Sequence, residues 1–152
     1  MKRIIFDTSV YGRLVNDYDL TEKLKNLFEK KEFVVYGNSL IRSELKNTPK
    51  QIILGNKRLR ILMLSLYDYF VRKENHDLKN NKLIETLSLD YFKDYKNKNG
   101  NFSKEELKND LVIIATATIY QLDIIVSSDK RTMFSRELIT VYNTVNRKYG
   151  MK

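Results

Sequence analysis

Two aspartates follow short apolar runs, and this placement suggests a chemical role for them. Asp7 comes directly after residues 3–6, and Asp129 follows residues 123–126 after two serines. Both runs are rich in β-branched side chains and lack polar alternation, which is typical of strands buried on both faces of a parallel sheet. Ligands of open α/β sheets bind at the carboxyl ends of such strands. We therefore expect both carboxylates at that edge of the sheet.

Two further acids lie in segments with helical spacing. Glu44 falls in the second turn after Ser39, and Asp110 shares a helical face with Ile113 and Ile114. An acid on an apolar face points toward the core, and a buried acid needs a partner. Because that face carries no evident Lys or Arg, a divalent cation is a candidate partner for Asp110.

The chemistry that such a set could support is phosphodiester hydrolysis. Oxygen ligands suit Mg²⁺ or Mn²⁺, and a bound metal can lower the pKa of water from 15.7 toward about 7 and neutralise phosphate charge. The chain has 28 Lys and Arg against 19 Asp and Glu, a net charge of +9. This excess favours a polyanionic partner, although a solvated Lys-rich surface would have the same composition.

Each acid also has a simpler interpretation when it is taken alone. Asp7 or Asp129 could close a strand or cap a turn. Asp110 could interact with a helix dipole, and Glu44 could be an exposed helical residue. The metal-site hypothesis depends on the four acids acting together.

Several other chemistries are disfavoured by the composition. The chain has no Cys, hence no disulfide, no thiolate nucleophile and no thiolate metal site. Its single histidine, His76, lies in a polar run typical of a surface loop, so a His-based triad is not available. No Gly-rich phosphate loop is present, which disfavours an NTPase. A phosphotransferase of the haloacid dehalogenase type needs a second Asp two residues after the first, where this chain has Ser9, and the acidic pair of a response-regulator receiver is not evident.

The first apolar run stops at Asp7, and a run of this length is too short for a signal peptide or a membrane span. We expect a cytoplasmic protein without membrane association.

The elements that must position these acids alternate between strand and helix patterns. Strands are expected at residues 3–6, 33–36, 123–126 and 138–142. Helical patterns cover residues 58–71, 78–95 and 110–121, and the whole stretch 40–121 looks helical. This alternation predicts a single α/β domain over residues 1–152, with a central, mostly parallel sheet of four to five strands and helices on both faces.

Capping signals mark where three of the helices should begin. Asp19 with Glu22 and Ser103 with Glu106 each fit a capping box. Ser39 is the expected cap of the helix that carries Glu44.

Four sequence blocks resemble PIN-domain ribonucleases, in the order found in that family. The blocks are residues 4–9 (IIFDTS), 35–45 (VYGNSLIRSEL), 109–117 (NDLVIIATA) and 122–129 (LDIIVSSD). They resemble the opening strand with its Asp, the second strand and Glu-bearing helix, the helix that opens with the third acid, and the late strand that ends in the fourth. The stretch between the second and third blocks is longer than in compact members of the family, which predicts an added helical segment around residues 50–100.

The resemblance implies a three-layer PIN-like fold and an Mg²⁺- or Mn²⁺-dependent endoribonuclease. Asp7, Asp110 and Asp129 would bind the metal, and Glu44 would bind it or orient the attacking water. Small polar residues beside the first acid, here Thr8 and Ser9, would support the site by hydrogen bonding.

Free-standing PIN domains of this length are mostly similar to VapC-type toxins of type II toxin–antitoxin systems. These toxins cleave RNA, are silenced by a cognate antitoxin and commonly form homodimers. The alternatives are a PIN nuclease of RNA processing and a non-catalytic PIN-like module that binds RNA or protein.

RNA contacts are expected from residues near the proposed site. Tyr11 and Arg13 follow the Asp7 loop, and Lys130 and Arg131 follow Asp129. Tyr11 could stack on a base or be a packed aromatic, and the two cations could hold the RNA backbone or be solvated turn residues. Five further cations could form a basic rim of the site or be scattered solvated charges. They are Lys46, Lys50, Lys57, Arg58 and Arg60.

Overall fold

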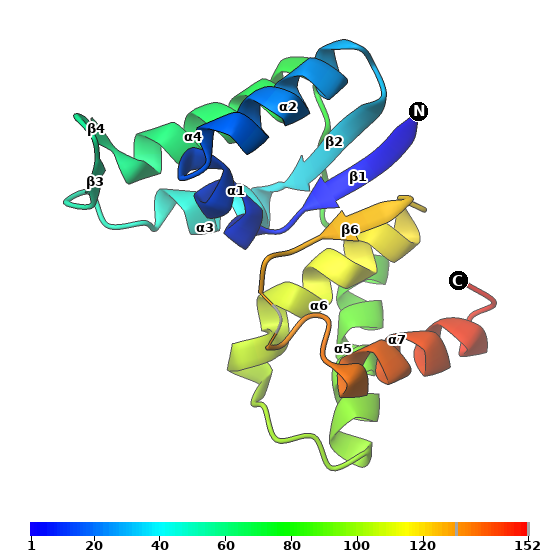
Figure 1. Ribbon diagram of the computed structural model, residues 1–152. Coiled ribbons are helices and arrows are strands. Elements are labelled where there is room, and N and C mark those ends of the chain that lie inside the picture. Colours follow the sequence, from blue (N-terminus) through cyan, green and yellow to red (C-terminus); the bar gives the residue numbers. More distant parts are fainter. Residues whose placement is uncertain (130, 152) are drawn as a thin grey trace. The chain divides into compact units, whose positions relative to one another are not determined.

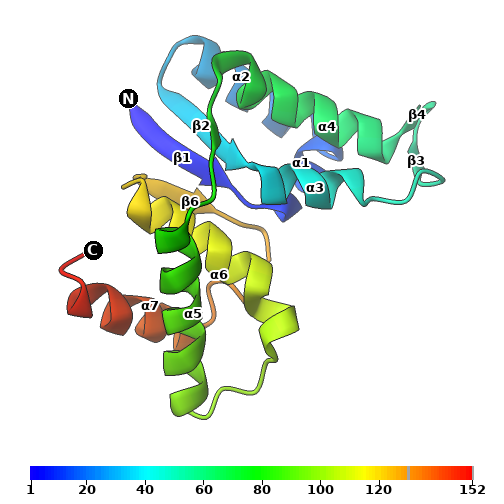
Figure 2. The same ribbon diagram turned by 180° about the vertical axis from the view of Figure 1, so that it is seen from behind.

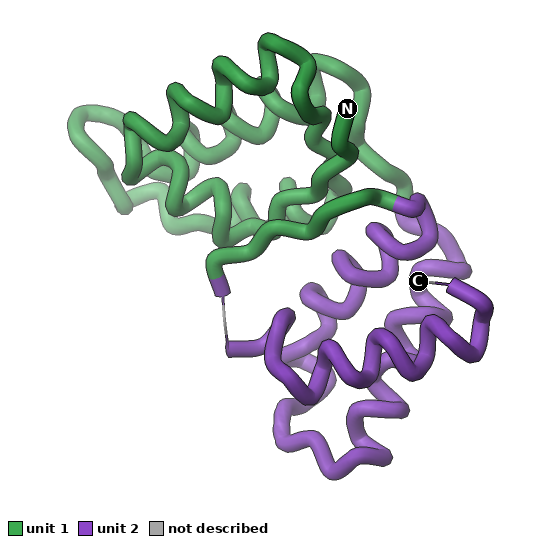
Figure 3. The backbone as a smooth tube through the Cα atoms, turned by 45° about the vertical axis from the view of Figure 1, so that its right-hand side comes forward, with its two compact units in different colours: residues 1–79, 122–128 green, residues 80–121, 129–152 purple. Residues whose placement is uncertain are grey.

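The alternating strand and helix patterns produce an α/β fold in the computed structural model, which describes residues 1–129 and 131–151 (Figure 1). The chain divides into two compact units, Met1–Lys79 with Leu122–Ser128 and Asn80–Gln121 with Asp129–Lys152 (Figure 3). These are unit 1 and unit 2, respectively. The prediction of a single domain stays a prediction.

Unit 1 contains a four-stranded parallel sheet and its helices. The sheet has the order β5-β2-β1-β6, and β1 pairs in parallel with both β2 and β6. The predicted fold class, α/β with a parallel sheet of four strands flanked by helices, is confirmed. The elements of unit 1 are β1 (Lys2–Phe6), α1 (Thr8–Val15), α2 (Tyr18–Glu29), β2 (Phe33–Asn38), α3 (Ser39–Lys46), β3 (Ile53–Leu54), β4 (Lys57–Arg58), α4 (Leu59–Phe70), the 3₁₀ turn η1 (Arg72–Glu74), β5 (Asp77–Leu78) and β6 (Ile124–Val126).

The core of unit 1 forms where the strands meet these helices. Ile5 and Val35 on neighbouring strands are fully buried, as are Ile41, Tyr67 and Phe70 on the helices. Burial of β-branched and aromatic side chains supplies most of the favourable free energy of folding.

Unit 2 consists of helices. They are α5 (Lys82–Asn97), α6 (Lys104–Ile119) and α7 (Arg136–Lys148). Helix α5 packs against both α6 and α7, and α5 and α6 lie side by side in Figures 1 and 2. The predicted capping box of Ser103 and Glu106 is present at the start of α6.

The strand expected at residues 138–142 is wrong, because this segment lies inside helix α7. Its β-branched run looks strand-like by composition, but Leu138, Val141 and Val145 are buried on one helical face with spacings of three and four. Ser135 caps the helix by accepting a hydrogen bond from the backbone N–H of Leu138 at 3.3 Å.

Two predicted caps and one predicted helical stretch also differ from the structure. Asp17 rather than Asp19 caps α2, and Asn38 rather than Ser39 caps α3; each side chain accepts from a backbone N–H three residues on. In each case the predicted and the observed residue are types that cap helices well, so residue type alone does not distinguish them. Residues 40–121 are not entirely helical, because the short strands β3, β4 and β5 interrupt them.

None of the helices in the described part of the chain is long and apolar enough to cross a bilayer.

Candidate active site

Asp7 lies at the carboxyl end of the central strand β1. The chain leaves β1 through α1 and α2 to reach β2 on one side, and β6 lies on the other side of β1. This edge is therefore a topological switch point, where open α/β sheets bind ligands. Asp7 is only 6% exposed and caps α1 in an extended conformation.

The Asp7 carboxylate accepts three hydrogen bonds from unit 1. Oδ1 accepts from the backbone N–H of Thr8 at 2.7 Å, and Oδ2 accepts from the hydroxyls of Ser9 at 3.0 Å and Ser127 at 2.8 Å. The backbone N–H of Ser128 in turn donates to Ser9 Oγ at 3.0 Å. Neutral donors thus orient this carboxylate, and none of the ion pairs between described residues includes it.

Glu44 also belongs to unit 1 and lies on α3, which follows β2 directly. Its Oε1 atom is shielded from solvent although the residue as a whole is half-buried. Helix α3 starts at this sheet edge because Asn38, the last residue of β2, caps it. The structure therefore places two of the four predicted acids in the unit that contains the sheet.

The other two acids belong to unit 2. Asp110 is half-buried on α6, where its Oδ2 atom accepts a hydrogen bond from Thr132 Oγ1. Burial and the negative charge of Asp110 together raise the pKa of Tyr142 above its usual value. The Asp129 carboxylate accepts from the backbone N–H of Arg131 at 2.9 Å.

Asp110 does not open its helix, contrary to the expectation from the resemblance. Helix α6 begins at Lys104, because the capping box of Ser103 and Glu106 starts it more than one turn before Asp110. Asp110 consequently lies within the helix, where an acid gains little from the helix dipole. Its carboxylate instead accepts a hydrogen bond from the Thr132 hydroxyl.

The four acids are thus divided equally between the two units. Within the residues that the structure describes, no group of three or more His, Asp or Glu side chains is gathered to hold a metal ion. A centre that uses all four acids needs contributions from both units, so it stays a prediction. The oxygen donors present in each unit do match the ligands that Mg²⁺ and Mn²⁺ prefer.

Comparisons with family models, with curated proteins and with solved structures give no match to this chain.

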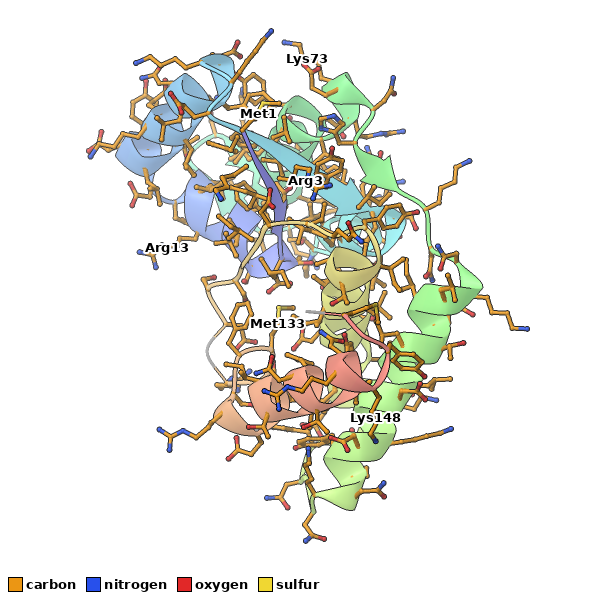
Figure 4. All side chains as sticks on the ribbon, turned by 90° about the vertical axis from the view of Figure 1, so that its right-hand side faces the viewer. Met1, Arg3, Arg13, Lys73, Met133 and Lys148 are labelled. Carbon is orange, nitrogen blue, oxygen red and sulfur yellow. The ribbon has the colours of Figure 1, made fainter. Side chains whose placement is uncertain are left out.

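The predicted RNA-contact residues have different environments. Arg13 is exposed on α1 and extends away from it (Figure 4). Arg131 is also exposed, with its Nε 3.9 Å from Asp129 Oδ1. Lys130 lies outside the described residues.

The expectation that Tyr11 stacks on a base is wrong. In the structure Tyr11 is a packed aromatic residue, which was the alternative. The side chain is fully buried, with its ring 5.9 Å from Phe6 and 5.6 Å from Tyr67 between centroids. No face of the ring is left for a base. The Tyr11 hydroxyl is buried and has no hydrogen-bond partner among the described residues, and burial raises its pKa.

Tyr11→Phe should stabilise the protein by about 1 kcal/mol, because it removes a buried polar group that has no partner. Thermal unfolding of the variant should show a Tm about 2–4 °C above wild type. RNA affinity should not change. A lower Tm would show that the hydroxyl has a partner, such as a bound water.

Two supporting residues were missed by sequence reasoning. Ser127 donates to Asp7 across 120 positions of sequence, and Thr132 donates to Asp110 across 22. The pair Ser127-Ser128 before Asp129 is a weak signal for the first contact, while no local pattern indicates the second.

His76 packs against strand β2. Its ring stacks on Tyr36 with centroids 4.5 Å apart, and its Nδ1 lies 3.2 Å from the backbone oxygen of Val35. These contacts join η1 and β5 to strand β2.

Proposed function

We propose that the chain is a metal-dependent endoribonuclease that hydrolyses RNA phosphodiester bonds. The observation that carries this proposal is the Asp7 site: a carboxylate 6% exposed, at the switch point of a parallel sheet, oriented by two serine hydroxyls. Among residues 1–129 and 131–151, Asp7 forms no ion pair. A buried carboxylate in this state suits a divalent cation, which would take the place of an ion-pair partner.

Chain connectivity supports including Asp129 in the proposed site beside Asp7. Ser127 Oγ touches Asp7, and Asp129 is only two residues further along. Because consecutive Cα atoms are about 3.8 Å apart, the Cα of Asp129 lies within about 7–8 Å of the Cα of Ser127. The end of β6 therefore keeps the Asp129 backbone close to the segment that contacts Asp7.

Each residue has a distinct role in the proposed reaction. Asp7, Asp110 and Asp129 would hold Mg²⁺ or Mn²⁺, and Glu44 would complete the ligand set or orient the attacking water. Ser9 and Ser127 keep Asp7 Oδ2 in place. The bound cation would supply an activated water and neutralise charge on the phosphate.

The net charge of +9 also fits a polyanionic substrate. The narrower proposal, from the resemblance, is a cytoplasmic toxin of a toxin–antitoxin pair that forms homodimers and is silenced by a cognate antitoxin. A PIN nuclease of RNA processing and a non-catalytic PIN-like module that binds RNA or protein are the alternatives.

Incubating the purified chain with RNA and Mg²⁺ or Mn²⁺ should give cleavage products, and a chelator should stop the reaction. Mn²⁺ should also raise the Tm of wild type, because a ligand at 100 times its Kd stabilises the native state by about 2.7 kcal/mol. Asp7→Asn should lose this shift.

The matched control substrate is DNA of the same sequence. Cleavage that persists in chelator would contradict the metal mechanism. RNA binding without cleavage and without a Mn²⁺ shift would instead support the non-catalytic module.

A further inference from the structure

A small β-hairpin projects from unit 1 between helices α3 and α4 (Figures 1 and 2). Strands β3 and β4 pair in antiparallel fashion, with Leu54 opposite Lys57. Gly55 in the two-residue turn has φ of +67°, a conformation that favours glycine. We call residues 46–60, which contain this hairpin, the basic arm.

The basic arm carries positive charge without nearby acidic residues in sequence. Residues 45–67 contain five Lys and Arg and no Asp or Glu. No ion pair found within residues 1–129 and 131–151 involves any of the five. These five cations are Lys46, Lys50, Lys57, Arg58 and Arg60. The lysines of α2 differ, because acids are interleaved with them and Lys25 lies 4.0 Å from Glu22.

The start of α4 adds a second observation. Arg58 occupies the N-cap position and makes no side-chain capping hydrogen bond, and the first turn contains no acid. A cation at a helix N-terminus is electrostatically unfavourable, since that end carries partial positive charge. Most chains place Ser, Thr, Asp or Asn there. Retaining Arg58 at this position is more readily understood if an anionic partner binds it.

We propose that the basic arm binds the sugar–phosphate backbone of the RNA substrate. This inference rests on the nuclease function proposed above and adds the surface that holds the substrate. The arm begins at Lys46, the last residue of α3, and α3 is the helix that carries Glu44. Its cations neutralise phosphates without reading sequence, and the exposed Ile52 and Ile53, at 44% and 63%, supply apolar contact to the sugars.

Binding can be measured separately from cleavage with a 2′-O-methyl RNA oligonucleotide in chelator, using fluorescence anisotropy over a range of salt concentrations. The variant Lys50→Gln/Lys57→Gln should bind about tenfold more weakly, and the slope of log K against log salt should become shallower by about 1.4–1.8. The matched control is Lys23→Gln/Lys30→Gln, which removes the same charge from α2 and its C-cap residue in the same unit and should have a much smaller effect.

Arg58→Thr gives a second, independent readout. It should raise Tm by about 2–4 °C, because it introduces an N-cap and removes an unfavourable charge. It should also weaken RNA binding. A purely structural Arg58 would leave RNA affinity unchanged.

Equal losses in the arm and α2 double variants would overturn the proposal, because the effect would then follow net charge alone. Unchanged RNA affinity in the arm variant would also overturn it. If the arm variant instead lost binding to anionic phospholipid vesicles while its RNA affinity stayed the same, the arm would be a membrane-binding surface and the proposal would be wrong. RNA binding through the arm by a chain that cleaves no RNA would refute the nuclease function and support the arm as an RNA-binding surface.

Discussion

Asp7→Asn abolishes RNA cleavage while the protein remains folded: this is the largest functional effect that we expect. The substitution keeps the shape of the side chain, and the amide oxygen can still accept the hydrogen bond from the Thr8 N–H. It removes the negative charge that would hold the cation. Metal-ion catalysis is worth several kcal/mol of transition-state stabilisation, so the rate should fall by about three orders of magnitude or more.

The measurement is the initial rate of cleavage of a labelled RNA, with circular dichroism to establish that the variant is folded. Asp19→Asn is a matched control, because Asp19 is an exposed acid of the same unit with no proposed role. Ser127→Ala should give an intermediate loss of about 10–100-fold, as is usual for residues that orient a metal ligand. Full activity of Asp7→Asn would refute the site.

Tyr67→Ala should cause the largest loss of stability, about 3–5 kcal/mol. The Tyr67 ring is fully buried and contacts the ring of Tyr11, so truncation leaves a cavity. The hydroxyl of Tyr67 lies 3.0 Å from the backbone oxygen of Asn38 and also hydrogen-bonds to Asp77. Burial and the hydrogen bond to Asp77 raise the pKa of Tyr67, so the phenol stays protonated as a donor at neutral pH.

Urea unfolding monitored by circular dichroism measures this loss, and Tyr67→Phe is its control. Tyr67→Phe keeps the ring and should cost only about 0.5–1.5 kcal/mol for a neutral hydrogen bond, or up to about 3 kcal/mol if the bond to Asp77 dominates. A loss for Tyr67→Ala that does not exceed that for Tyr67→Phe would show that the cavity relaxes fully.

Gly37 explains why Tyr67 matters at this sheet edge. A Cβ atom on Gly37 would lie 2.4–2.8 Å from the Tyr67 ring and hydroxyl. The absence of a side chain therefore lets the ring pack directly on β2, next to the Asn38 cap of α3. Tyr67 thereby supports the start of the helix that carries Glu44.

Local patterns were sufficient for much of the fold. The runs at residues 3–6, 33–36 and 123–126 form β1, β2 and β6, because short β-branched and aromatic stretches favour strands. Their burial is less complete than the pattern predicts, since Ile124 of β6 is exposed and only part of β1 and of β2 is buried. The capping box at Ser103 also follows from local chemistry. Residues 138–142 form part of helix α7 rather than the predicted strand, because a short β-branched run resembles a strand until the spacing to Val145 is included.

By itself, the sequence determined that an acid follows the first strand and that Ser9 stands two residues beyond it. Only the tertiary structure decided that Ser127 joins Ser9 at Asp7, that Tyr11 is buried, and that β5 completes the sheet. Periodicity and capping depend on neighbours within a few residues, so they are readable along the chain. Contacts such as Ser127 to Asp7 join residues 120 positions apart, and they form only when strand pairing and core packing bring those segments together.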